Sequence, residues 1–185
     1  LAVCSDEIHN GLVLDPNCRH RVFATLSPEI AARSITLMAP SKTFNIPGLG
    51  CAFAIISSAH LRRGFQRAMH GIVPHVNALG MAANEAALTR CDDWQAALRN
   101  YLRGNARAVE RTVAELPGLD MRPVEATYLA WIDARDFAAD HGIANPAQHF
   151  ESHGLGLSDG ADFGAPGFVR LNFGTRRTLL DEALA

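Results

Sequence analysis

Three short apolar runs constrain the fold of this chain more than any other feature. They cover residues 1–4, 34–38 and 51–56, and polar residues follow each of them within a few positions. Short, predominantly apolar runs are typical of strands that are covered on both faces, as in a mostly parallel sheet. The chain therefore predicts an α/β fold in which polar side chains follow the ends of buried strands.

Helical patterns fill the middle of the chain. Residues 59–72 and 74–88 are predicted helices, and Pro74 is expected to open the second one. A long helix is expected over residues 94–116, where Pro117 and Gly118 stop it. Its apolar positions recur at helical spacing: Trp94, Leu98, Tyr101, Leu102, Val109, Val113 and Leu116.

The rest of the chain alternates between short strands and short helices. Strands are expected at 121–124, 127–132 and 168–173, and helices at 136–141, 146–152 and 176–184, the last capped by Thr175. The predicted parts are the end of a large, mostly parallel α/β domain (1–90), a connecting helix (91–117) and a small α+β domain (118–185). Because the chain begins without Met and directly in a predicted strand, we expect it to be part of a longer protein.

Charge and composition exclude several classes of protein. The 185 residues carry a formal net charge of −2, whereas a general nucleic-acid binder usually has an excess of basic residues. Residues 43–61 lack charged side chains, but Pro47, Gly48 and Gly50 predict a buried loop and strand and not a membrane span. The four Cys have no CxxC spacing and the eight His no HExxH pattern, so we expect free thiols, a cytoplasmic location and no metal site.

Lys42 is the only lysine among 17 basic residues. A coding bias can favour Arg wherever only a positive charge is needed, but Arg cannot replace Lys where a primary amine must lose its proton. Lys42 follows the strand predicted at 34–38, and partial burial at a strand end lowers the pKa of an amine toward the range in which it is nucleophilic. Such a lysine forms Schiff bases with carbonyl compounds. The alternative is an ordinary solvated lysine in a loop.

Asp6, His9 and Arg170 are further candidates. Asp6 follows the first predicted strand and can reach the same sheet edge as Lys42, where a carboxylate can hold the proton of a pyridinium ring. The alternative for Asp6 is a turn or capping residue, and His9 taken alone is more often structural than catalytic. Arg170 lies among apolar residues of the strand predicted at 168–173 and needs a carboxylate partner, which the protein or a substrate could equally supply.

Four motifs carry a resemblance to a known family. They are Ser-Asp-Glu-Ile-His at 5–9, Ala-Pro-Ser-Lys-Thr-Phe-Asn-Ile-Pro-Gly-Leu at 39–49, Glu-Ala-Thr-Tyr-Leu-Ala-Trp-Ile-Asp at 125–133, and Gly-Phe-Val-Arg-Leu-Asn-Phe-Gly at 167–174. In order and spacing the chain resembles the second half of a fold-type I, pyridoxal-phosphate-dependent enzyme of the class I/II aminotransferase superfamily. The first three motifs are most similar to the cystathionine β-lyase (C–S lyase) subgroup.

The resemblance implies pyridoxal 5′-phosphate as the cofactor and a role for each candidate residue. Lys42 would join the cofactor as a Schiff base and Asp6 would pair with its pyridine nitrogen. Arg170 would bind the α-carboxylate of an amino-acid substrate. His9 stands where many relatives have a Tyr near the 3′-oxygen of the cofactor, and Ser41 would help to hold the phosphate.

Two positions depart from the family pattern for phosphate binding. Ala39 stands where many relatives have a hydroxyl residue, and Gly50 where many have an Arg. Phosphate binding must therefore depend on other groups, some of them outside this chain. The resemblance also implies a homodimer with its active site at the subunit interface, so the chain alone is expected to be incomplete as a catalyst.

The activity implied is α,β-elimination from cystathionine or a related S-conjugate of cysteine, which releases pyruvate, ammonia and a thiol. An aminotransferase would use the same residues, because both reactions begin with the same proton transfer. A third possibility is a non-catalytic chain without bound cofactor. A Schiff base of the cofactor with Lys42 gives a visible absorbance band, and borohydride reduces it to a stable adduct on Lys42. Both signals are expected of the first two possibilities and not of the third.

Overall fold

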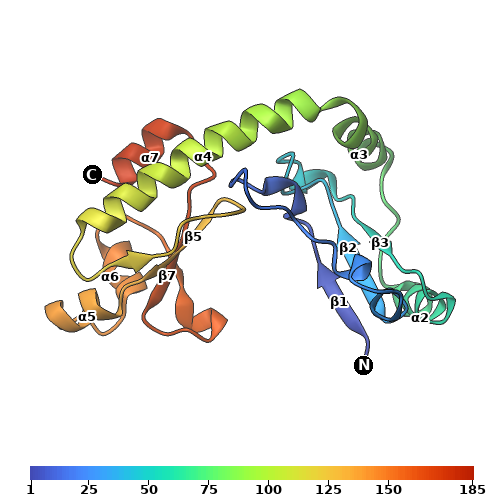
Figure 1. Cartoon of the computed structure of the whole chain (residues 1–185), viewed down its shortest axis with the longest axis horizontal. Helices are drawn as coiled ribbons and strands as arrows, with labels where there is room; N and C mark the ends of the chain where they lie inside the picture. The colour runs from blue at the N-terminus through green and yellow to red at the C-terminus, as the bar shows by residue number, and fades with distance from the viewer. The chain divides into compact units, whose positions relative to one another are not determined.

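The chain forms two compact units, Leu1–Ala97 and Leu98–Ala185, and the boundary between them falls inside one long helix. The computed structural model describes all residues from 1 to 185 and is drawn in Figure 1. The helix is α4 (Asp92–Glu115), and it corresponds to the connecting helix expected over 91–117. The assignment of the flanking parts to a large and a small domain stays a prediction.

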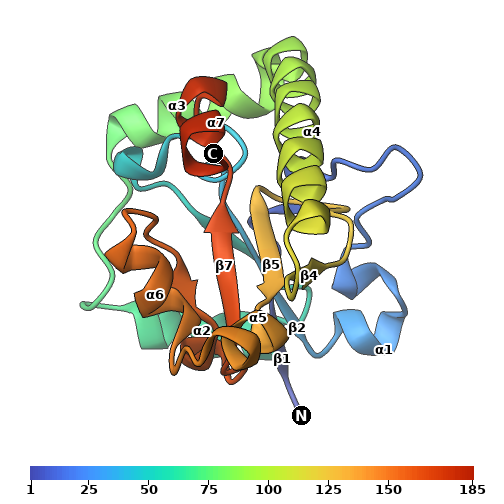
Figure 2. The same ribbon diagram turned by 90° about the vertical axis from the view of Figure 1, so that its left-hand side faces the viewer.

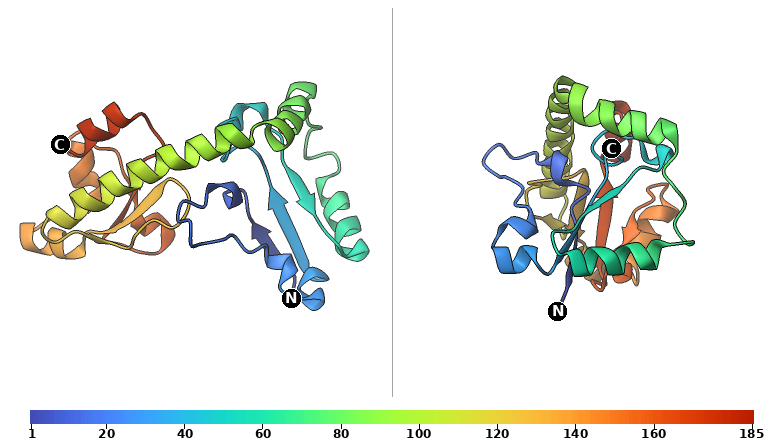
Figure 3. Two further views of the ribbon diagram at one scale, coloured as in Figure 1. Left: turned by 45° about the horizontal axis from the view of Figure 1, so that its top comes forward. Right: turned by 90° about the vertical axis from the view of Figure 1, so that its right-hand side faces the viewer.

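The first unit contains a three-stranded sheet in the order β1-β2-β3. Strand β1 (Val3–Asp6) runs parallel to β2 (Ser34–Met38), and β2 runs antiparallel to β3 (Phe53–Ile55). All three strands lie within or beside the runs expected to form them. Figure 3 follows this unit from β1 in dark blue through β2 and β3 to the green helices.

The expectation that both faces of this sheet are covered is wrong for β3 within this unit. Phe53 and Ile55 are 37% and 54% exposed. Faces are covered by elements packed against them and not by pairing within the sheet, and Val3 of β1 is likewise 40% exposed. The apolar residues at 51–56 predict a strand correctly. Whether their side chains are buried depends on neighbouring elements that the local sequence does not specify.

Side-chain caps set the helix starts in the first unit. Ser27 accepts a hydrogen bond from the Ile30 N–H at the start of α1 (Pro28–Ala31), and Ser58 caps α2 (Ala59–Met69) in the same way. The predicted helix start at Pro74 is wrong. Helix α3 (Ala78–Arg90) begins later, because the side chain of Asn77 accepts the N–H of Gly80 and caps it there.

The second unit is built on a four-stranded antiparallel sheet in the order β4-β5-β7-β6. Its strands are β4 (Asp120–Met121), β5 (Leu129–Asp133), β6 (Ser158–Asp159) and β7 (Phe168–Asn172). Figure 2 shows β5 and β7 side by side at the centre of this sheet. Its other helices are α5 (Arg135–His141), α6 (Pro146–Ser152) and α7 (Arg177–Ala183).

One face of this sheet and one stripe of α4 form the core of the second unit. Its buried side chains are Leu102, Ala106, Val109, Val113, Ala130, Ile132, Val169, Leu171, Phe173 and Leu180. The core positions of α4 follow helical spacing, as expected. Trp94, Tyr101 and Leu116 also fit that spacing, yet they are 46%, 45% and 46% exposed, so the apolar stripe of the sequence is wider than the buried one.

Three predicted boundaries in the second unit are wrong. The strand expected at 121–124 is confined to Asp120–Met121. The strand expected from residue 127 begins at Leu129, because Thr127 has a φ of 64°, which is not a strand conformation. Thr175 does not cap the last helix, since the first N–H of α7, that of Arg177, donates to the hydroxyl of Tyr101 at 2.6 Å.

None of the helices of this chain combines the length and the apolarity that crossing a membrane requires. Residues 43–61 form turns, loops, strand β3 and the first residues of α2, so the loop and strand expected there are present. The expected burial is wrong, because Pro47, Gly48 and Gly50 are exposed and only Thr43 and Ile56 in this segment are buried.

Candidate functional site

Asp6 and Lys42 leave neighbouring parallel strands at the same edge of the first sheet. Asp6 is the last residue of β1 and pairs with Leu37 in β2. The chain leaves β2 at Met38 and reaches Lys42 within one turn. Because the carboxyl ends of parallel strands meet at one edge, the carboxylate and the amine belong to that edge, where α/β folds bind ligands.

His9 is the third candidate residue at this end of the sheet. It lies in the turn after β1. Burial lowers the pKa of the His9 imidazole below its ordinary value, the positive charge of Lys42 lowers it further, and the negative charge of Asp6 opposes the change. The structure therefore brings together three of the residues singled out in the sequence, an amine, a carboxylate and an imidazole.

The loop that carries Lys42 is held by its own backbone and by packing. The N–H of Phe44 donates to the carbonyl of Pro40 at 2.8 Å, and the N–H of Ile46 donates to the carbonyl of Ser41 at 3.1 Å. Thr43 is 3% exposed, and the Phe44 ring stacks on Trp94 with 5.9 Å between ring centroids. Lys42 and Ser41 remain half-buried between these anchors.

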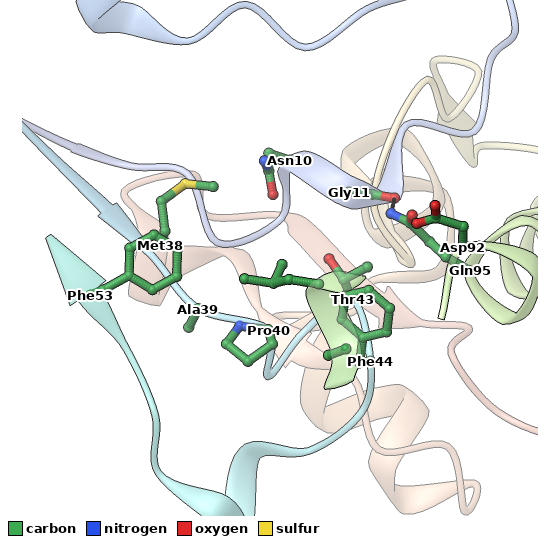
Figure 4. A pocket seen from close by; sticks show the side chains of 12 residues that line it. Asn10, Gly11, Met38, Ala39, Pro40, Thr43, Phe44, Phe53, Asp92 and Gln95 are labelled. Atoms are coloured by element: carbon green, nitrogen blue, oxygen red, sulfur yellow. Dashed lines mark hydrogen bonds between the residues drawn. The ribbon is translucent and has the colours of Figure 1, made fainter. Parts of the chain in front are cut away.

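A cavity of about 140 Å³ lies on one side of this loop (Figure 4). Its lining includes Asn10, Thr43, Phe44, Asp92 and Gln95, but none of the candidates Asp6, His9, Ser41, Lys42 or Arg170. Gln95 crosses its edge and donates to the carbonyl of Gly11 at 2.9 Å. The cavity is therefore separate from the candidate site, and its walls support the lysine loop.

Glu7 is a residue of this site to which the sequence assigned no role. It is 4% exposed, and its carboxylate accepts hydrogen bonds from the Ser5 hydroxyl at 3.0 Å and the Phe23 N–H at 3.0 Å. Nε2 of His20 lies 2.6 Å from its second oxygen. Glu7 thus anchors the turn between Asp6 and His9. The only available signal was an acidic residue directly after a buried strand, which also describes many exposed turns.

The charge of Glu7 depends on these partners. Burial alone would raise the pKa of its carboxyl group. Hydrogen bonds from His20, from the Phe23 backbone and from Ser5 outweigh burial, and together they hold the pKa below its usual value. Glu7 is therefore an ionised buried carboxylate at neutral pH.

Arg170 belongs to the second unit and lies on β7. Its Nη2 donates to the Ser158 hydroxyl at 3.2 Å, and its guanidinium carbon lies 4.4 Å from the centroid of the Phe163 ring. The ion pairs of the structure are His20–Glu7 and Arg135–Asp133, so no Asp or Glu of this chain pairs with Arg170. Of the two partners left open by the sequence, the structure supplies no protein carboxylate.

Known proteins resemble this chain over its whole length. The sequence model for "Aminotransferase class I and II" matches residues 1–185. Cystathionine beta-lyase PatB of Bacillus subtilis (strain 168) is 34% identical and is matched over 100% of this chain and 48% of its own length.

Two solved structures show the similarity in three dimensions. The crystal structure of OvoB has a TM-score of 0.94 and 50% identity, over 100% of this chain and 48% of that one. The PLP-bound C–S lyase of Staphylococcus hominis, in its external aldimine form with the inhibitor L-cycloserine, has a TM-score of 0.90 and 28% identity, again over 100% and 48%. The predicted transferase-like α/β fold is thereby confirmed.

The chain spans about half the length of the relatives that it matches. The matched residues 1–185 include the positions of every motif on which the resemblance rested. The chain belongs to the aminotransferase class I and II family.

Proposed function

We propose that this protein is a pyridoxal 5′-phosphate-dependent C–S β-lyase. It would cleave cystathionine or a related S-conjugate of cysteine to pyruvate, ammonia and a thiol. The observation that carries the proposal is that Asp6 and Lys42 follow neighbouring parallel strands at their carboxyl ends, with His9 in the turn after β1. The names of the relatives, a cystathionine beta-lyase and a PLP-bound C–S lyase, support elimination as the reaction.

The residues at this edge fit the proposed cofactor. Pyridoxal phosphate, when bound, supplies an aldehyde that condenses with amines and a pyridine ring that accepts the electron pair released at Cα. A primary amine suits the aldehyde, and a carboxylate suits the protonated ring nitrogen. Lys42 and Asp6 provide this pair from neighbouring strands.

Lys42 would have two tasks. Its Nζ would hold the cofactor covalently in the resting protein and would be free once the substrate is bound. The freed amine would take the proton from the substrate Cα as a general base. The backbone of the loop that carries it is held by hydrogen bonds from the Phe44 and Ile46 N–H groups, which supports both tasks.

Asp6 and His9 would set the charges around the ring. Asp6 would hold the proton on the ring nitrogen, and the turn anchored by Glu7 would keep its carboxylate in place. Partial burial and the charge of Lys42 lower the pKa of His9, so it is a neutral imidazole at pH 7 and can donate a hydrogen bond without adding charge. Ser41, next to Lys42, would contribute its hydroxyl to phosphate binding.

Arg170 would bind the α-carboxylate of the substrate. A guanidinium supplies five donors in a planar fork that matches a carboxylate. The Ser158 hydroxyl occupies one of them, and no acidic residue of this chain occupies the rest. Holding the carboxylate orients the bond to be broken, which is an effect on the rate as well as on affinity.

Covalent trapping tests the proposal directly. The full-length protein is mixed with pyridoxal phosphate, reduced with borohydride and digested, and the modified peptide is identified by mass spectrometry. We expect the adduct on Lys42 and its loss in Lys42→Ala. A full yield of adduct at another site, or pyruvate release from cystathionine by Lys42→Ala at the wild-type rate, would refute the proposal.

A substrate panel separates elimination from transamination. Pyruvate and thiol from cystathionine without an added 2-oxo acid indicate the lyase. Exchange of amino groups that requires a 2-oxo acid indicates the aminotransferase. We expect the first result, because the curated relative with 34% identity carries the name of a lyase.

We also propose a homodimer, as the family resemblance implies, and a cytoplasmic location. Light scattering after size exclusion measures the first, and cell fractionation measures the second. A monomer with full lyase activity would contradict the proposed shared active site.

A further inference from the structure

We propose that Ser158 and Phe163 are positioning residues that hold Arg170 ready for the carboxylate of the substrate. The inference rests on the proposed function, and it names two side chains on which recognition of the substrate depends. It comes from a comparison of two arginines on the same face of the second sheet, Arg170 and Arg135.

Strand register places the relevant side chains on one face. Arg170 of β7 pairs with Trp131 on β5 and with Ser158 on β6, and residues directly opposite one another point to the same side of a sheet. Their neighbours Val169 and Leu171 point to the other side and are 0% and 7% exposed in the core. The face of Arg170 is thus the open face of the sheet.

A row of aromatic rings connects the two arginines on this face. Phe163 stands edge-on to Trp131, with centroids 5.8 Å apart, and Trp131 stacks on Phe168 at 5.5 Å. Arg170 lies over the first ring of this row, Phe163, at 4.4 Å. Arg135 lies over the last ring, Phe168, at 5.0 Å.

The two arginines differ in what they bind besides the ring. Nη2 of Arg135 lies 2.7 Å from Oδ2 of Asp133, and its Nε lies 2.9 Å from Oδ1, so a carboxylate of the chain fills its fork. Arg170 has only the Ser158 hydroxyl. The Phe163 ring and the Ser158 hydroxyl therefore support the Arg170 guanidinium. Asp133 binds the guanidinium of Arg135, but no acidic residue of this chain binds that of Arg170.

The two supports are themselves fixed by the turn that connects them. Asp159 accepts the Ala161 N–H at 2.9 Å at the start of the turn 160–163 and the side-chain amide of Asn145 at 2.7 Å. A Cβ at Gly160 would lie 2.4 Å from the carbonyl oxygen of Ala165, so only glycine permits this close turn. The turn leads from Ser158 directly to Phe163, and both reach Arg170 from the same short segment.

Preorganisation predicts an effect on binding and not on the chemical step. An unsupported arginine side chain must give up rotamer freedom when it binds a carboxylate, and a supported one has already lost it. We expect Ser158→Ala and Phe163→Leu each to raise KM for cystathionine by about threefold to tenfold, with kcat changed less than twofold. Ser158→Thr and Phe163→Tyr keep the hydroxyl and the ring, so both should stay within twofold of wild type.

The deciding experiment is calorimetric titration of the full-length holoenzyme with L-alanine, which carries the carboxylate but has no β-leaving group. Arg170→Gln gives the largest loss of affinity expected, and Phe168→Leu is the matched control, because its ring supports an arginine that already has a carboxylate. Steady-state KM and kcat for cystathionine are measured on the same proteins.

The outcomes separate this inference from the proposed function. Weaker L-alanine binding in Ser158→Ala and Phe163→Leu, with wild-type binding in Ser158→Thr and Phe168→Leu, supports the inference. If Arg170→Gln binds weakly while Ser158→Ala and Phe163→Leu bind like wild type, the positioning role is refuted and the proposed function stands. If the wild type does not bind L-alanine, or Arg170→Gln binds it equally well, the carboxylate assignment fails and this inference fails with it. Should Phe163→Leu not fold, the Ser158→Ala and Ser158→Thr pair still decides.

Discussion

Nε2 of His20 lies 2.6 Å from Oε2 of Glu7, and this contact joins the end of β1 to a segment 13 residues further along the chain. The carboxylate is 3% exposed and the imidazole 32%. Because Glu7 directly follows Asp6, the contact determines where the end of β1 points, and its strength affects the candidate site as well as the fold.

Acidification should weaken the fold through Glu7. The pKa of this group is lowered from its ordinary 4.5, because hydrogen bonds from His20, Phe23 and Ser5 outweigh the opposing effect of burial. A carboxyl group with a lowered folded-state pKa stabilises the fold above its ordinary pKa, and the contribution is lost as the pH falls through the lowered value. We expect Glu7→Gln to cost about 1–3 kcal/mol of unfolding free energy at pH 7 and much less at pH 3.

Urea denaturation at pH 7, 5, 4 and 3 measures this difference. The exposed Glu85 of α3 is the control, and Glu85→Gln should change the unfolding free energy by less than about 0.5 kcal/mol at each pH. An equal cost of Glu7→Gln at pH 7 and pH 3 would show that its charge contributes nothing.

The titration of His9 tests the closeness of Lys42 and Asp6. Burial and the charge of Lys42 lower the pKa of His9 from 6.5, and Asp6 acts in the opposite direction. Lys42→Ala should therefore raise the pKa of His9, and Asp6→Asn should lower it further. Proton NMR of the imidazole follows both shifts, and His9→Gln identifies the resonance. Shifts of the same sign in the two variants would mean that the three groups do not meet as described.

Gly11→Ala should disturb the loop that carries Lys42, because the new Cβ would collide with Thr43 of that loop. A Cβ at residue 11 would lie 2.6 Å from Nε2 of Gln95 and 2.7 Å from the side chain of the buried Thr43. Since Thr43 is branched and enclosed, we expect a loss of about 1–3 kcal/mol in stability and a lower yield of borohydride-trapped Lys42.

Gly64→Ala is the matched control for Gly11→Ala. Nothing lies within 4 Å of a Cβ at residue 64, in the middle of α2, so alanine should stabilise that helix by about 0.5–1 kcal/mol. Trapping of Lys42 in this variant should equal wild type. A Gly11→Ala protein with wild-type stability and trapping would show that the loop adapts without cost.

Asn105 should be the costliest polar residue of the second unit to remove. It is 0% exposed, donates to the carbonyls of Phe173 and Thr175 at 2.8 and 3.0 Å, and accepts from Nε of Arg177 at 2.8 Å. Asn105→Ala leaves these groups without a partner and should cost about 1–3 kcal/mol for each one that stays dry.

Asn100, on the same helix, is the comparison for Asn105. Its side chain is exposed and accepts only from Arg103 at 2.8 Å, so Asn100→Ala should change stability by less than about 0.5 kcal/mol. Thermal unfolding of both variants gives the result, and equal melting temperatures would contradict the role assigned to Asn105.

Local sequence is informative where one segment decides the outcome. The segment 34–38, rich in apolar and β-branched residues, forms β2 as expected. The helix expected from residue 94 is α4, because its apolar stripe repeats at 3.6 residues per turn. The rarity of lysine singled out Lys42, and two strand ends suggested that Asp6 lies beside it. These inferences needed only composition, periodicity and the geometry of parallel strands.

Contacts between distant segments decided the rest. The sequence left the partner of Arg170 open between a protein carboxylate and a substrate. Only the pairing of β6 with β7 placed a hydroxyl, Ser158, at its side and left no acid of the chain there. Glu7 likewise became a buried anchor only through His20 and Phe23. Burial and hydrogen bonding are properties of neighbours in space, and a local pattern specifies which side of an element is apolar but not which side chain will cover it.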